Sequence, residues 1–177
     1  MTAANWDIDS RQSDVILRAR HSIIAYLASS VNKFKGSINV KNDELEDASV
    51  EFEINVNQKS GKLEKMETNF QLKDLFDTTQ NPIISFKSTS FEKVNANINF
   101  IKGYLTINNV TKIVELDAVL IDLETYNGIS KAIFEVIGKI NRKDFGLYYN
   151  SFSQSNGIMI GQEITINANL EFLSKIN

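Results

Sequence analysis

The stretch NFQLKDLFDTTQNPIISFKSTSF, residues 69–91, contains the change of pattern that decides the fold. Its first part, up to Asp77, predicts a short amphipathic helix, and the helical spacing of apolar residues already begins at Leu63. After the only proline, Pro82, the run Ile83-Ile84-Ser85-Phe86-Lys87-Ser88-Thr89 predicts a strand. Strand patterns also dominate on both sides of this stretch, so the expected fold class is all-β with a short helix between strands.

The same alternation runs through most of the chain and is clearest at residues 49–57. There Val50, Phe52, Ile54 and Val56 point to one face, while glutamate and asparagine residues point to the other. Further strands are predicted at residues 13–20, 37–40, 83–91, 97–101, 103–107, 112–123, 132–141 and 162–173.

Turn residues separate these strands and indicate how they are joined. Asn108-Asn109 is expected to form a two-residue hairpin turn because asparagine tolerates positive φ, and residues 126–128 form another predicted turn. Many short strands with turns between them favour a sandwich or a closed barrel. One apolar and one polar face on many strands suits a single antiparallel layer that curls on itself.

Length and composition indicate one folded domain that comprises residues 1–177. The chain has 177 residues, 42% of them hydrophobic and 23% charged, which is enough apolar sequence for a core or a barrel. The net charge is -3 and no basic cluster is present, so we expect no nucleic-acid partner.

The absence of cysteine excludes disulfides, thiolate metal ligands and a cysteine nucleophile. With a single histidine, His21, no metal site is expected either. The first residues show neither a basic start nor an apolar segment, so a cytoplasmic location without a signal peptide is predicted. A chain from which a leader had been removed would instead be compatible with the periplasm. No apolar run is long enough for an integral membrane helix.

Several short motifs follow one another in the order and at the spacing of a known family. They are Trp6-Asp7-Ile8-Asp9, His21, Phe34-Lys35-Gly36, then Leu72, Phe76, Asp77 and Pro82 ahead of Phe86-Lys87-Ser88-Thr89, then Gly103-Tyr104-Leu105-Thr106-Ile107 with Thr111-Lys112, and Arg142-Lys143-Asp144-Phe145-Gly146. On these residues the whole chain resembles the YceI family, the polyisoprenoid-binding, lipocalin-like proteins. Two positions depart from the family pattern, because Gln12 replaces a histidine before Ser13 and Ser29 replaces an inner glycine.

The resemblance implies an extended eight-stranded antiparallel barrel of the lipocalin type, with the helix lying across it. Such proteins hold a long isoprenoid or a similar amphiphile inside the barrel, and they often form homodimers. The implied ligand is a polyisoprenoid or fatty-acid-like lipid, and no other cofactor is expected.

The candidate ligand-binding residues are those on the apolar faces of the predicted strands. They are Val15, Leu17, Val50, Phe52, Ile54, Phe86, Leu105, Ile107, Phe134, Val136, Ile164 and Ile166. A core filled by its own side chains would show the same pattern, so each position is equally compatible with packing. His21 is a candidate donor to a phenol, quinone or carboxylate head group, although a bond to a backbone carbonyl or an acidic side chain is the favoured interpretation.

Three further residues are expected to have structural roles. Arg142 and Asp144 could form a salt bridge, and Trp6 could pack on Arg142 as a cation–π pair that closes one end of the bore. Apolar residues on the opposite strand faces are expected to be covered by the helix or by a second subunit. These are Val119, Ile121, Ile133 and Ile137.

The favoured function is non-catalytic binding, storage or transport of a long amphiphile such as a quinone or its precursor. Burying about 400 Å² of a prenyl chain gives roughly 10 kcal/mol before association costs of about 4–15 kcal/mol, so the barrel must be pre-formed. One alternative is a stress-response or interaction protein with a self-filled barrel. An enzyme acting on an isoprenoid-type lipid is less favoured, because no nucleophile elbow, phosphate loop or dinucleotide fingerprint is present.

Overall fold

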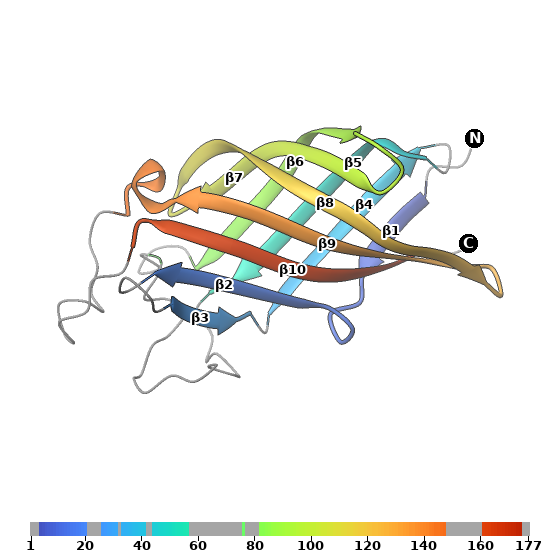
Figure 1. Ribbon diagram of the computed structural model, residues 1–177, viewed down its shortest axis with the longest axis horizontal. Helices are drawn as coiled ribbons and strands as arrows, with labels where there is room; N and C mark the ends of the chain where they lie inside the picture. Colours follow the sequence, from blue (N-terminus) through green and yellow to red (C-terminus); the bar gives the residue numbers. More distant parts are fainter. Residues whose placement is uncertain are drawn as a thin grey trace.

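The computed structural model describes residues 4–20, 26–31, 33–41, 44–56, 76, 82–147 and 161–174 of the chain. These residues form an all-β structure with one short 3-10 helix (Figure 1). The elements are β1 (Ala4–Ile8), β2 (Asp14–Arg20), β3 (Tyr26–Ser30), β4 (Phe34–Lys41), β5 (Glu44–Asn55), β6 (Ile83–Lys93), β7 (Ile98–Ile107), β8 (Val110–Tyr126), β9 (Ile129–Asn141), η2 (Arg142–Phe145) and β10 (Glu163–Ser174).

Eight of the strands form a closed antiparallel ring, which confirms the predicted barrel. Their order around the ring is β1, β4, β5, β6, β7, β8, β9 and β10, and β1 pairs back onto β10. The closing pair aligns Trp6 with Ser174 and Ile8 with Phe172. Both neighbours of every strand in this ring are therefore strands, and the inward faces enclose one interior.

Two strands lie outside the ring and extend the wall at one end. The last residues of β10, 172–174, pair with β1, whereas residues 164–169 of β10 pair with β2. β3 then pairs with the other edge of β2. The barrel has two ends. The β1 end contains β1 and the start of β7, and the opposite end, the η2 end, contains η2. Figure 1 shows the β8–β9 hairpin projecting beyond the other strands at the β1 end.

The predicted turns are present and have the expected backbone. Asn108 and Asn109 have φ angles of 51° and 63°, and Asn127 and Gly128 have φ angles of 50° and 79°. Several strands begin or end at other residues than predicted, β5 for example at Glu44 and not at Ser49. Residues 97–101 and 103–107 belong to the single strand β7, since Gly103 does not interrupt the pairing, and the short β1 and β3 were not predicted.

The helix predicted between residues 63 and 77 lies outside the described residues, except for Phe76, which is buried. In the part of the chain that the structure describes, no helix is long and apolar enough to cross a membrane.

The two motif glycines, Gly36 and Gly103, are required by phenylalanine rings on neighbouring strands. A Cβ atom added at Gly36 would lie 2.8 Å from the ring of Phe52, its partner across β4 and β5. A Cβ atom at Gly103 would lie 2.6 Å from the Phe86 ring and 2.5 Å from the carbonyl oxygen of Lys87. Each ring therefore lies over a glycine, which lets a large side chain fit inside a narrow barrel.

Replacement of Gly103 by alanine should destabilise the barrel. The new methyl group meets the Phe86 ring and a backbone oxygen that is fixed in the sheet, so we expect the free energy of unfolding to fall by about 1–3 kcal/mol in urea titrations. The matched control is Lys102→Ala, which loses only an exposed ion pair to Glu115 at 3.7 Å and should cost less than about 1 kcal/mol. Equal effects of the two substitutions would contradict this packing.

Candidate functional site

The interior of the barrel contains an apolar cavity of about 100 Å³. Its described wall has one residue with a polar side chain, Ser85, and no titratable group. The lining residues are Val15, Leu17, Ile38, Val50, Phe52, Ile54, Phe76, Ile84, Ser85, Phe86, Phe91, Ile101, Leu105, Ile107, Ala118, Phe134, Val136, Ile140, Ile166, Ala168, Leu170 and Phe172.

The cavity is long for its volume. Ile84 and Phe91 both line it, and the seven residue steps from one to the other along β6 correspond to about 23 Å of extended strand. Because a cavity of this small volume extends along a wall of this length, it is a narrow bore and not a wide chamber. Pockets for drug-sized ligands usually measure roughly 300–1,000 Å³, so the bore as it stands suits a slim chain and not a fused ring system.

The predicted apolar ligand-binding residues converge on this bore. Val15, Leu17, Val50, Phe52, Ile54, Phe86, Leu105, Ile107, Phe134, Val136 and Ile166 line it. Ile164 is buried in the core but is not part of the lining, and His21 lies outside the described residues. Contact of these side chains with a ligand stays a prediction.

Sequence reasoning missed about half of the wall, and Phe91 shows why. Phe91 is five positions after Phe86, an odd offset, so simple alternation would place the two rings on opposite faces. A register shift between Ser88 and Ser90 reverses the alternation and turns Phe91 inward. Other missed residues, such as Ile38 and Ile101, continue a visible alternation and could have been found from it.

At the β1 end of the barrel, three side chains with polar atoms are buried, namely Trp6, Asn99 and Ser174, and none of them is part of the cavity lining. Trp6 is 8% exposed, and its indole nitrogen Nε1 is buried and forms no hydrogen bond with any described residue. Asn99 is 3% exposed, and its Nδ2 donates to the carbonyl oxygen of Ala118 at a long 3.5 Å. Ile38, the partner of Trp6 on β4, lines the bore, as does Ala118.

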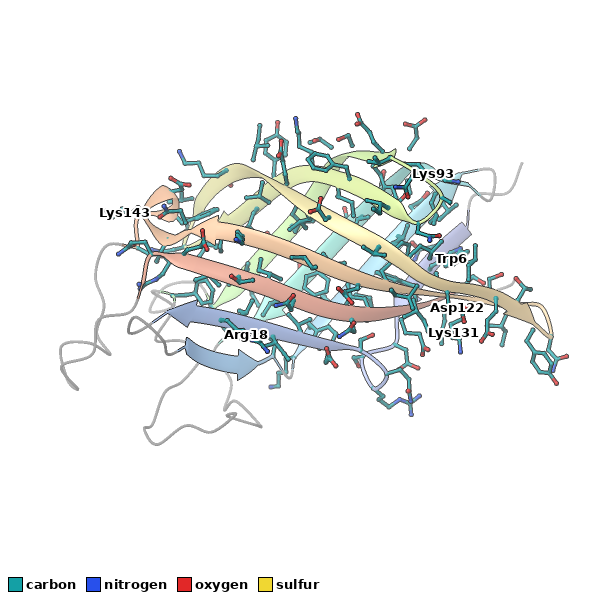
Figure 2. The ribbon with its side chains drawn as sticks, viewed as in Figure 1. Trp6, Arg18, Lys93, Asp122, Lys131 and Lys143 are labelled. Atoms are coloured by element: carbon teal, nitrogen blue, oxygen red, sulfur yellow. The ribbon has the colours of Figure 1, made fainter. Side chains whose placement is uncertain are left out.

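The predicted contact between Trp6 and Arg142 is wrong, because they lie at opposite ends of the barrel. Trp6 is paired with Ser174, whereas the backbone N–H of Arg142 donates to the carbonyl of Gln162. The twelve residues from Gln162 to Ser174 correspond to about 40 Å of extended chain. Figure 2 shows Trp6 and Lys143, the neighbour of Arg142, at opposite ends.

Arg142 lies buried in η2 at the η2 end. Its side chain is 1% exposed, and burial lowers the pKa of the guanidinium from an ordinary value far above neutral, so the group stays charged. Asp144 is exposed, and the predicted ion pair is not among the salt bridges of the described residues. The Asn141 carboxamide oxygen accepts from the N–H of Lys143 at 2.9 Å and caps this helix.

The outer faces of β8 and β9 are partly apolar. Val119 and Ile133 are half-buried, whereas Ile121 and Ile137 are exposed in the described structure. That the helix or a second subunit covers Ile121 and Ile137 stays a prediction. Lys131 holds the projecting hairpin through Glu124 at 2.7 Å and Glu171 at 3.8 Å. The hydrogen bond to Glu124, together with these negative charges, raises the pKa of Lys131.

The described residues contain no group of three or more His, Cys, Asp or Glu side chains arranged to hold a metal ion. The chemistry that the described interior offers is therefore apolar burial along the bore, with hydrogen bonding confined to a few positions.

Comparisons with known proteins agree with this fold. A profile of the YceI-like domain matches residues 6–172. Protein YceI of Shigella flexneri is 32% identical over 151 residues, which cover 82% of this chain and 77% of that protein. The crystal structure of the Campylobacter jejuni YceI protein has a TM-score of 0.68 at 22% identity and covers 89% of this chain and 90% of that chain. A structure described as a polyisoprenoid binding domain from Saccharophagus degradans, implicated in plant cell wall breakdown, has a TM-score of 0.69 at 10% identity, covering 94% and 97%.

A larger side chain at Ala168 should be accepted by the bore. Ala168 lines the cavity, so Ala168→Leu adds apolar contacts without displacing the wall, and we expect a melting temperature equal to or above that of the unmodified protein. Ala132→Leu is the control, since Ala132 is fully buried but not part of the lining, and overpacking there should cost about 1–3 kcal/mol. A comparable loss for both variants would contradict the position of the bore.

Proposed function

Because the chain belongs to the YceI-like domain family, we propose that its barrel binds the apolar chain of a polyisoprenoid or a similar long amphiphile. Quinones and quinone precursors are examples of such amphiphiles. The related fold from Saccharophagus degradans is described as a polyisoprenoid binding domain, which supports this class of ligand. The proposal covers storage or transport without catalysis.

The observation that carries the proposal is the shape and chemistry of the bore. It is narrow and elongated, and apolar side chains from strands all around the ring line it. A linear hydrocarbon chain is the ligand class that gains most from such a wall, because each buried methylene contributes about 0.8 kcal/mol. The closed ring keeps the wall in place before binding, which reduces the ordering cost.

The composition of the wall also supports a non-catalytic role. General acid–base or nucleophilic catalysis needs a titratable or nucleophilic side chain within hydrogen-bond reach of the reacting atom. Among the described lining residues only Ser85 has a hydroxyl, and no histidine or acidic residue lies beside it in the wall.

A second candidate function is supported by the small volume of the cavity. About 100 Å³ is less than a long prenyl chain fills, and the rings of Phe134 and Phe172 pack edge to face within the wall, with centroids 6.0 Å apart. A long ligand therefore requires several phenylalanine side chains to change rotamer. If they do not, the barrel is self-filled and serves as an interaction or stress-response domain.

Two other expectations remain predictions for this chain. One is a homodimer, which light scattering on the purified protein would measure. The other is a cytoplasmic location, which fractionation of the source cell would measure.

Lipid retention should distinguish Phe86 from its neighbour Lys87. Phe86 lines the bore and Lys87 is exposed on the outer face, so Phe86→Ala should retain several-fold less lipid per folded molecule, while Lys87→Ala should match the unmodified protein. Organic extraction followed by mass spectrometry measures the retained lipid. Because truncating a buried phenylalanine costs about 3–5 kcal/mol, the folded fraction of each variant must be measured in parallel.

The Ala168→Leu variant separates the two candidate functions. A leucine in the bore should displace retained lipid from a carrier while the protein stays folded. Absence of any extractable long-chain lipid in the unmodified protein, purified from several hosts, would favour the self-filled barrel.

A further inference from the structure

The β1 end of the barrel holds, beyond the residues that line the cavity, a buried hydrogen-bond donor without a described partner. Trp6 points inward, because its neighbour Asn5 is exposed and its cross-strand partner Ile38 lines the bore. More than nine-tenths of the Trp6 side chain is buried, and Nε1 has no described acceptor. A buried donor of this kind costs roughly 1–3 kcal/mol when it stays unpaired, so an acceptor that reaches it gains affinity.

Another buried polar group, Asn99, lies on β7, which is four strands away from β1 around the ring. Following the register from Trp6 through β4, β5 and β6 leads to Gly103 on β7. Following the register the other way round the ring, through β10 and β9, leads to Thr125 on β8. The first residue of β7, Ile98, pairs with Val119, so Thr125 lies beyond the start of β7. Since barrel strands are tilted, the level of Trp6 on β7 lies between these limits, and Asn99 falls within this range.

Apart from Ser174, the cross-strand partner of Trp6, whose hydroxyl oxygen accepts from the backbone N–H of Ser130 at 2.9 Å, the buried side chains described near this pair are apolar. Ile38, Phe91, Ala118, Leu170 and Phe172 belong to the bore wall in this half of the barrel. Within the described structure the one buried charged residue is Arg142, and it lies at the η2 end. A carboxylate or phosphate beside Trp6 would be desolvated without a counter-charge, whereas a neutral oxygen would not carry that penalty.

We propose that Trp6 and Asn99 form a subsite for a neutral oxygen, a carbonyl or hydroxyl, at the polar end of a slim amphiphile. The indole N–H donates to this oxygen, and the Asn99 carboxamide supplies the opposing polar surface. This subsite rests on the proposed function, and it assigns the polar end of the ligand to the β1 end of the bore. The ligand class becomes ketones, quinones and alcohols with a linear apolar chain, and fatty acid anions are disfavoured.

The single tryptophan makes this subsite directly observable, because the chain has one indole N–H signal in a nitrogen-labelled sample. The probes are decane, methyl octyl ketone and decanoate, which have the same number of carbons. We expect the ketone to shift the indole proton downfield and to bind roughly three- to tenfold more tightly than decane. Decane should bind without that shift, and decanoate should bind more weakly than the ketone.

The matched variant is Trp6→Phe, which keeps an aromatic ring and removes the donor. In this variant the ketone should lose its advantage and bind no more tightly than decane, because its oxygen is then buried without a donor, while the affinity for decane should be unchanged. If Trp6→Phe does not fold, the indole shift in the unmodified protein still decides the question. Asn5→Ala, on the exposed face of the same strand, should leave all three affinities unchanged.

The outcomes separate the subsite from the bore itself. If decane and the ketone bind equally and the indole signal does not move, the subsite is wrong while binding in the bore stands. If none of the three probes binds, the proposed function fails and the subsite fails with it. If decanoate binds more tightly than the ketone, the assignment to a neutral oxygen is wrong.

Discussion

Closure of the sheet by the short strand β1 is the constraint on which the interior depends. β1 pairs with β4 on one side and with β10 on the other, so segments from the two ends of the chain complete one ring. Without it, β4 and β10 would each present an unpaired edge beside the bore, and unpaired edges invite other chains to bind. The strand that closes the ring also places Trp6 inside it, so the closure and the polar end of the bore depend on the same residues.

The width of the bore follows from how phenylalanine is accommodated. An eight-stranded barrel is just wide enough for its own side chains, and here the rings of Phe52 and Phe86 lie over glycines on the adjacent strands. This arrangement keeps the rings near the wall, and what remains along the axis is narrow. The wall therefore selects ligands by shape, and a linear chain is admitted more readily than a ring system. Any ligand thicker than the bore must move these rings and disturb the glycine contacts beneath them.

Local sequence patterns predicted the strands other than the short β1 and β3, the two asparagine turns and half of the bore wall, because each depends on residues close in the chain. What they could not predict depends on the ring as a whole. The register shift in β6 reverses alternation before Phe91, and no residue type marks it unambiguously. The tilt of the strands decides which residues lie at the same end of the barrel, so Trp6 lies far from Arg142. The predicted helix lies outside the described residues.

An apolar wall and a single buried donor contribute differently to recognition. The wall gives affinity in proportion to the area it buries, and it treats every slim hydrocarbon of the same length alike. One hydrogen bond adds little net affinity, but it discriminates because a ligand without an acceptor leaves the buried N–H of Trp6 unpaired. The unpaired N–H already destabilises the free protein. A ligand with an acceptor therefore gains affinity from two sources, the apolar contacts along the wall and the hydrogen bond at its polar end. An amphiphile would therefore bind in one orientation, because the two ends of the bore differ in polarity.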